Sequence, residues 1–292
     1  MAQASGLEGF FQRHPAMASE GLAGRTAWIS GAVQGIGLAV TSKLVLQGVN
    51  VVMADLVDEA EGQALAAKLS KQGPGRAVYD RVDVTNSQAL QCSIVETPKS
   101  AFHGPATIVL NNAGVVVDDD AGEEKVKTML GVNLTAVILG THYAAEAVKA
   151  AGKKGVIVNT ASMGGLLPLP ETPSYSASKW GVVGFTVACR PLKKSHGVRV
   201  NCICPAMTQT PAVGSFFEGK FRSQDENHVL LKHTLHPAEV ADAVIAVIED
   251  EKLNAQAAAV MPHMSYLHNF DFTAVTTQSM REGVKALPRS KL

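Results

Sequence analysis

The chain has 292 residues, of which 46% are hydrophobic, 18% charged and 5% aromatic. This is an ordinary core-forming composition, and the length suits one large α/β domain or two small ones. The 26 basic and 26 acidic side chains cancel, so no basic field favours nucleic acid or an anionic membrane surface. No apolar run approaches the roughly 20 residues of a membrane-spanning helix. We therefore expect neither a nucleic-acid partner nor a membrane span.

Strand-like and helix-like runs alternate along the chain. Residues 26–29 predict a short buried strand, and a glycine-rich turn and an apolar helix through Leu46 follow it. Continuous apolar strands separated by helices are typical of a parallel sheet covered on both faces. The fold class is therefore α/β, a doubly wound domain with about seven parallel strands. Further strands are predicted at 49–54, 77–84, 107–110, 156–160, 199–203 and 257–261, and helices near 58–72, 86–101, 122–150, 176–194 and 238–250.

No linker divides the chain into two domains. We expect a leader at 1–20, one domain at 21–267 and a tail at 268–292. The leader lacks the apolar core of a secretory signal, and a flexible segment is favoured over a weak organellar presequence. The tail ends in Ser290-Lys291-Leu292, the peroxisomal address that an import receptor reads. This ending predicts a location in the peroxisomal matrix, and the alternative is an accidental basic tail.

The four cysteines are Cys92, Cys189, Cys202 and Cys204. The last two are two residues apart, which is the wrong spacing for a CxxC pair, and on a strand they would point together into the core. We expect all four to be reduced thiols in a non-oxidising compartment. Neither they nor the histidines near residue 230 have the spacing of metal ligands, so no metal site is predicted.

The run SGAVQGIG, residues 30–37, follows the first predicted strand. Its glycines, Gly31, Gly35 and Gly37, follow a G-x3-G-x-G pattern. Glycine permits a tight turn from strand to helix and lets backbone amides approach a pyrophosphate at the positive end of the helix. Because glycine turns are common at such junctions, this run alone is a weak signal of dinucleotide binding.

Asp55 strengthens the signal, because it ends the second predicted strand 18 residues after Gly37. A carboxylate there can accept hydrogen bonds from an adenosine ribose, and it would repel the extra phosphate of NADP. Basic residues that would bind this phosphate are missing, since Gln34 lies in the turn and Leu56 follows the carboxylate. The pattern favours NAD over NADP. The alternative is that Asp55 merely caps the next helix.

The run SYSASKWG, residues 174–181, places Tyr175 and Lys179 four apart, on one face of a predicted helix. A nearby ammonium favours a phenolate and lowers the pKa of a phenol from about 10. Such a tyrosine could exchange protons with a substrate near neutral pH. The alternative is that the small residues serve close helix packing and the pair only flanks the contact.

Taken in order, these motifs resemble the short-chain dehydrogenase/reductase family over roughly residues 22–262. Within the family, HGPATIVLNNAG and LLPLPETPSYSASKWGVVGFT resemble the NAD-dependent hydroxyprostaglandin dehydrogenase-type members. The resemblance implies a single Rossmann-type domain, NAD as cofactor and assembly into a homodimer or homotetramer. The marks that carry it are the glycine turn at 31–37, Asp83-Val84, Asn111-Asn112-Ala113-Gly114, Asn133, Ser162, Tyr175 and Lys179.

The resemblance also implies a role for each matching residue. Tyr175 would be the general base for alcohol oxidation, and Lys179 would lower its pKa and hold the nicotinamide ribose. Ser162 would bind the substrate oxygen, and Asn133 would anchor a water that relays protons. Their plainer alternatives are a loop serine and a helix-interior asparagine. The implied cofactor contacts are Gly31, Gln34, Gly35, Ile36, Gly37, Asp55, Asp83, Val84, Asn112, Ala113, Gly114, Tyr175, Lys179, Ile203, Pro205 and Thr210.

Three positions depart from the family pattern. Ser30 replaces a threonine, and we expect little effect because both have a hydroxyl. Ala206 replaces a glycine, so a positive φ there would be strained. Pro191 falls inside the helix after Lys179, at a cost of about 3 kcal/mol or more. A kink there would reshape a helix that family members often use for dimerisation.

The segment 207–236 is the expected substrate cover, and it is rich in Val, Leu and Phe. An apolar cover suggests a lipid-like or acyl substrate, although such residues also serve simply to dock a segment on the core. The first hypothesis is an NAD-dependent secondary-alcohol dehydrogenase acting on a hydroxylated lipid or hydroxyacyl compound in peroxisomes. The second is a carbonyl or 3-oxoacyl reductase. The third is a non-catalytic nucleotide-binding or structural subunit.

Overall fold

The computed structural model describes residues 21–211, 234–262 and 264–268. Its strands form one sheet in the order β3-β2-β1-β4-β5-β6-β7-β8, in which the first seven are parallel and β8 is antiparallel to β7. The parallel sheet of seven strands is as predicted. The antiparallel strand β8, which lies at the edge of the sheet and pairs only with β7, was not predicted. The strands are β1 Thr26–Ser30, β2 Asn50–Asp55, β3 Ala77–Arg81, β4 Ile108–Asn111, β5 Gly155–Thr160, β6 Val198–Pro205, β7 Ala257–Met261 and β8 Met264–His268.

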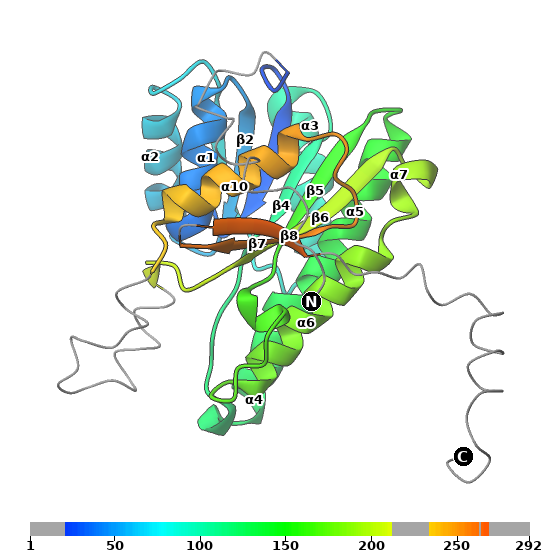
Figure 1. Cartoon of the computed structure of the whole chain (residues 1–292). Helices are drawn as coiled ribbons and strands as arrows, with labels where there is room; N and C mark the ends of the chain where they lie inside the picture. The colour runs from blue at the N-terminus through cyan, green and yellow to red at the C-terminus, as the bar shows by residue number, and fades with distance from the viewer. Residues whose placement is uncertain (1–20, 212–233, 263, 269–292) are drawn as a thin grey trace, which may run out of the picture.

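Helices cover both faces of the sheet (Figure 1). Neighbouring residues of one strand point to opposite faces, so Ile29 and Met53 pack in one core cluster while Trp28 and Val52 pack in another. The sheet is therefore buried on both sides, as a doubly wound domain requires. The first cluster includes residues of α1 Gly35–Leu46, α2 Glu59–Leu69 and α10 Pro237–Glu249, and the opposite face carries α3 Ser87–Phe102, α5 Ala136–Ala150 and α6 Pro173–Ala188.

Two predicted helices are divided in the structure. The helix expected at 122–150 consists of α4 Glu123–Leu130, a π-helical turn Gly131–Thr135, and α5. The helix expected at 176–194 is α6, which ends at Ala188, and Pro191 then begins the short helix α7, Leu192–Ser195. Proline lacks an amide hydrogen and clashes with the preceding turn, so it ends α6 instead of kinking it.

The structure also bears on the cysteines and on Ala206. All four cysteines are free, and Cys202 and Cys204 share one buried cluster. Outside glycine, a positive φ occurs in the described residues only at His103 and Ala255, so the strain expected at Ala206 is absent. No group of potential metal ligands occurs within the described ranges. The helices in these ranges are too short or too polar to cross a membrane.

Other predictions lie outside the described residues. These are the leader at 1–20, most of the cover and nearly all of the tail, including Ser290-Lys291-Leu292. They stay predictions, as does assembly into a homodimer or homotetramer. The base of the cover is described, and there Thr208 and Leu235 form a parallel bridge.

A chain of hydrogen bonds crosses the core between β1, α3 and β3. The indole Nε1 of Trp28 donates to Ser93 Oγ at 2.8 Å, and this hydroxyl donates to Asp80 Oδ2 at 2.6 Å. Trp28 is fully buried. A buried N–H group without a hydrogen-bond acceptor lowers the stability of the folded state. The indole of Trp28 therefore needs the acceptor that Ser93 provides.

Replacing Ser93 with alanine should therefore destabilise the protein. The Ser93→Ala variant leaves the buried indole N–H without its acceptor, and we expect a loss of about 1–3 kcal/mol in the free energy of unfolding. Urea titration followed by circular dichroism measures this loss. Ser100→Ala, an exposed position on the same helix, should change it by less than about 0.5 kcal/mol. Equal effects of the two variants would contradict the prediction.

Candidate active site

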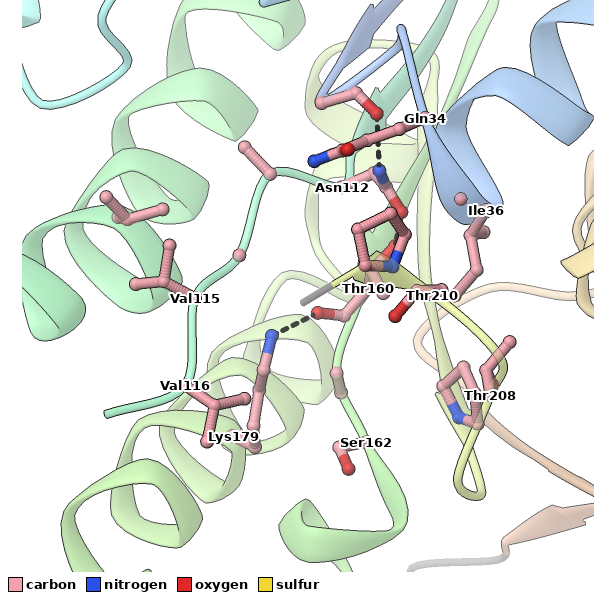
Figure 2. A pocket seen from close by; sticks show the side chains of 18 of the residues that line it. Gln34, Ile36, Asn112, Val115, Val116, Thr160, Ser162, Lys179, Thr208 and Thr210 are labelled. Atoms are coloured by element: carbon pink, nitrogen blue, oxygen red, sulfur yellow. Dashed lines mark hydrogen bonds between the residues drawn. The ribbon is translucent and has the colours of Figure 1, made fainter. Parts of the chain in front are cut away.

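A cavity of about 830 Å³ lies at the carboxyl ends of the parallel strands. The sheet reverses its strand order between β1 and β4, and ligands of doubly wound folds bind outside this switch point. In Figure 2, Val115 and Val116 lie on one side of the cavity, and Ile36 and Thr210 lie on the other. The loops after β1, β2, β3, β4, β5 and β6 all contribute to its lining.

The glycine turn has the shape that dinucleotide binding needs. Gly31 and Gly35 have positive φ values of 62° and 54°, a region that favours glycine. A β-carbon on Gly37 would lie 2.0 Å from the carbonyl oxygen of Gly31, so no other residue fits there. Gln34, the N-cap of α1, makes no side-chain capping bond. The first amides of α1 therefore remain available for an anion such as a pyrophosphate.

The Asp55 carboxylate is held against this turn. Its Oδ2 accepts from the backbone N–H of Val33 at 3.1 Å, and its Oδ1 accepts from the N–H of Leu56 at 2.8 Å. Asp55, Gln34 and Leu56 all line the cavity. Among the described lining residues the only cation is Lys179. Beside the glycine turn the described lining thus offers a fixed carboxylate and no basic partner for a 2′-phosphate.

The loop after β4 is fastened to the glycine turn by two side chains. Ser30 Oγ accepts from the N–H groups of Asn112 at 2.9 Å and Ala113 at 3.0 Å, so serine serves this turn as expected. Asn112 Nδ2 donates to the carbonyls of Ser30 at 3.1 Å and Gly31 at 3.2 Å. Its Oδ1 accepts from Thr160 Oγ1 at 3.3 Å. Asn112 therefore joins the glycine turn to the end of β5.

The predicted adenine-facing pair, Asp83 and Val84, also lines the cavity. Asp83 Oδ1 accepts from the N–H of Thr85 at 2.8 Å and from its hydroxyl at 2.7 Å. The Thr85 contacts fix the carboxylate at the end of the β3 segment. Its position agrees with a contact to the base, and the role itself stays a prediction.

Helix α6 carries Tyr175 and Lys179 one turn apart, and both line the cavity. Lys179 is almost fully buried, and its Nζ donates to the carbonyl oxygen of Thr160 at 3.0 Å. The same nitrogen lies 5.7 Å from the centre of the Tyr175 ring. Burial disfavours the ammonium and lowers the pKa of Lys179 to about 8.

The pKa of Tyr175 is shifted in the opposite direction from the one expected. Burial of the phenol raises its pKa, and a hydrogen bond with Ser162 lowers it by less. We had expected Lys179 to lower this pKa. In the protein alone the net shift is upward, because desolvation penalises the phenolate more than its neighbours stabilise it.

Ser162 and Asn133 take different positions. Ser162 lines the cavity, where it caps the 3₁₀ turn Met163–Gly165 by accepting from the N–H of Gly164 at 3.1 Å. Asn133 is fully buried in the π-helical turn, and its amide forms two hydrogen bonds with the backbone of Val115, at 2.9 and 2.8 Å. These contacts support the loop beside the cavity. A water relay through Asn133 stays a prediction.

Two predicted cofactor contacts, Gly37 and Ile203, do not line the cavity, and several lining residues were not predicted. Ile203 is buried in β6, its carbonyl accepts from the N–H of Ala161 at 2.8 Å, and it does not line the cavity. Pro205 and Thr210 do line it. The missed residues follow directly after recognised motifs, so extending each strand end by a few positions would have found most of them. They include Val115, Val116, Thr160, Met163, Leu169, Thr172 and Met207.

Comparison with known proteins agrees with this geometry. The family model for short chain dehydrogenases matches residues 25–220. The 15-hydroxyprostaglandin dehydrogenase [NAD(+)] of Mus musculus is 34% identical over 251 residues, covering 79% of this chain and 87% of that protein. Cyclohexanol dehydrogenase of Acinetobacter sp. (strain SE19) is 32% identical over 235 residues, covering 78% and 88%.

A solved structure shows the same architecture. The 3-ketoacyl-(acyl-carrier-protein) reductase from Brucella melitensis, complexed with NADH, superposes with a TM-score of 0.71 at 26% identity, covering 82% of this chain and 98% of that one. The family match and these relatives identify an oxidoreductase that acts on CH–OH donors. The chain belongs to the short-chain dehydrogenase family.

The ammonium of Lys179 is expected to serve function but to lower the stability of the folded protein, because it is buried. Below pH 8 the lysine is charged in the folded and the unfolded protein, so its burial costs about 3 kcal/mol, from the pKa change of 10.5 to about 8. Between pH 8 and 10.5 only the unfolded protein keeps the proton, so stability rises with pH in this window. Lys179→Met should therefore be more stable than the parent by about 1–3 kcal/mol at pH 7, with a smaller difference at pH 9.5.

Denaturant titration at several pH values measures this difference. Lys153→Met, an exposed lysine, is the control and should leave the free energy of unfolding nearly unchanged. A Lys179→Met protein that is less stable than the parent at every pH would show that the contact with Thr160 outweighs the burial cost.

Proposed function

We propose that this protein is an NAD-dependent oxidoreductase that oxidises a secondary alcohol to a ketone. One observation carries the proposal. Ser162, Tyr175 and Lys179 line the same cavity as the glycine turn and Asp55, and the ammonium nitrogen of Lys179 lies 5.7 Å from the centre of the Tyr175 ring. The reacting groups and the nucleotide site are thus parts of one space.

The residues present fit NAD. The glycine turn and the uncapped start of α1 suit a pyrophosphate, and the fixed carboxylate of Asp55 suits the adenosine ribose. Lys179 would hold the nicotinamide ribose, and Pro205 and Thr210 would lie against the carboxamide. When bound, NAD supplies the acceptor for a hydride from the carbinol carbon. The NAD(+)-dependent relative and the NADH complex named above support the same assignment.

The protein supplies the proton chemistry and the orientation. The hydroxyl of Ser162 would bind the substrate oxygen, and the phenolate of Tyr175 would accept the hydroxyl proton as the carbon–oxygen double bond forms. Its raised pKa in the protein alone means that the phenolate needs positive charge beside it. The ammonium of Lys179, held by Thr160, is placed to provide that charge.

The substrate end of the cavity favours an apolar alcohol. Among the described residues its wall comes from Val116, Met163, Leu169 and Met207, and no carboxylate or second cation joins them. Such a wall suits the body of a hydroxylated lipid or a hydroxyacyl compound. The similarity to hydroxyprostaglandin and cyclohexanol dehydrogenases agrees with a secondary alcohol on an apolar body.

Two other functions remain as outcomes of the tests. A carbonyl or 3-oxoacyl reductase would use the same residues in reverse, and a preference for NADPH would favour it over alcohol oxidation. A non-catalytic subunit would keep the fold without turnover. The presence of Ser162, Tyr175 and Lys179 in one cavity argues against a non-catalytic role.

Replacing Tyr175 with phenylalanine tests the chemistry. The Tyr175→Phe variant keeps the ring but loses the proton acceptor, so we expect a fall in turnover of about 10²–10⁴-fold with NADH affinity nearly unchanged. Steady-state oxidation of a panel of secondary alcohols, together with NADH fluorescence titration, provides both values. Tyr143→Phe, on α5, is the control and should behave like the parent. Substantial turnover by Tyr175→Phe would refute the mechanism.

Replacing Asp55 with asparagine tests the choice of cofactor. The parent should bind NADH much more tightly than NADPH, because the carboxylate repels the 2′-phosphate. Asp55→Asn keeps a side-chain acceptor for one of the two amides, of Val33 or Leu56, and removes the charge, so the preference should shrink by about 10-fold or more. Asp58→Asn, a carboxylate outside the cavity, should leave the preference unchanged. A parent that binds both cofactors equally would contradict the assignment.

A further inference from the structure

The catalytic helix α6 does not cap itself. Its N-cap residue, Thr172, makes no side-chain capping bond, and Pro173 at the first helical position has no amide hydrogen. The first free amide is that of Ser174. It donates to the carboxylate of Asp119, at 3.1 Å to Oδ1 and 3.4 Å to Oδ2. The cap of α6 thus comes from a residue 55 positions earlier in the chain.

Asp119 belongs to the segment that forms one wall of the cavity. This segment, residues 115–119, follows β4, and Val115 and Val116 line the cavity. Its first residue is held by the two hydrogen bonds between Val115 and Asn133. Its last residue is held by the start of α6. The segment is therefore fixed at both ends, beside the catalytic groups.

The hydrogen bond between Asp119 and Ser174 lies next to the proposed general base, Tyr175, in the sequence. Ser174 directly precedes Tyr175, so the bond from Asp119 acts on the backbone that carries the phenol. A carboxylate is also the preferred charge at a helix N-terminus. The cap therefore restrains the first turn of α6 and the neighbouring segment 115–119 together. Helix α4, which follows the segment 115–119 in the sequence, lies beside helix α6 (Figure 1).

We propose that Asp119 is a positioning residue, which fixes Tyr175 and closes the substrate end of the cavity by capping α6 from the neighbouring segment 115–119. The inference rests on the proposed function, since it assigns a purpose to the placement of Tyr175. Asp119 itself touches no reacting atom. Loss of the cap would loosen the wall at Val116 and let water reach the phenol, while the nucleotide end stays intact.

The test compares Asp119→Ala with two related variants. Asp120→Ala removes an adjacent exposed carboxylate and is the matched control. Asp119→Asn keeps an oxygen that can accept from Ser174 and should rescue most of the effect. We expect kcat/KM for alcohol oxidation to fall by about 10-fold or more in Asp119→Ala, since small displacements of a catalytic group are costly. The affinity for NADH should stay within about twofold of the parent in all three variants.

Two readouts do not depend on turnover. Hydrogen exchange of peptides that contain Ser174 should become faster in Asp119→Ala and stay unchanged in Asp120→Ala. The titration of Tyr175, isolated as the difference in phenolate absorbance from the same protein carrying Tyr175→Phe, should move to lower pH, because burial is what raises this pKa. A parent that binds NADH but oxidises no alcohol would refute the proposed function and leave these two readouts to judge Asp119.

The proposal has a clear contrary result. Unchanged hydrogen exchange at Ser174 and an unchanged titration of Tyr175 in Asp119→Ala would overturn it. So would equal losses of kcat/KM in Asp119→Ala and Asp120→Ala, because that result would reflect surface charge and not the cap.

Discussion

The carboxamide of Asn112 joins the parts of the site that bind and the parts that react. It donates to the carbonyls of Ser30 and Gly31, and it accepts from the hydroxyl of Thr160. Through these bonds the end of β4 is held between the ends of β1 and β5. The backbone of Thr160 in turn holds Lys179. The glycine turn and Lys179 are thus placed by one continuous set of hydrogen bonds across the switch point of the sheet, where ligands of such folds bind.

The electrostatics of the catalytic end are unfavourable for the protein alone. Burial lowers the pKa of Lys179 and raises that of Tyr175, so both groups are driven toward their neutral forms. The two neutral forms suit folding, and the charged forms suit proton transfer. A cationic nicotinamide ring would shift the phenol toward its ionised form. This is the usual relation between a buried active site and stability: groups that are kept for chemistry cost free energy in folding.

The substrate end is assembled from loops that follow different strands. The segment after β4 supplies Val115 and Val116, and the loop after β5 supplies Met163 and Leu169. The segment after β4 is held by Asn133 and by Ser174 at the start of α6. The loop after β5 is held by Ser176 of α6, whose hydroxyl donates to the carbonyl of Gly164 at 2.7 Å. Loops carry the specificity of such folds because a rigid sheet positions them. Both restraints involve the helix that carries Tyr175.

The sequence by itself determined the order of strands and helices, the glycine turn, Asp55 and the pair Tyr175 and Lys179, because these depend on local periodicity and on short spacings. It also marked Pro191 as a disturbance of the helix after Lys179, although it predicted a kink and not the end of α6. Only the tertiary structure decided the division of the predicted helix at 122–150 by a π-helical turn, the place of Ile203 in the core and the sign of the pKa shift of Tyr175. It also decided the cap that Asp119 provides. Each of these four features depends on which residues far apart in the sequence come into contact and on how deeply they are buried. The spacing of residues along the chain reveals neither the contacts nor the burial.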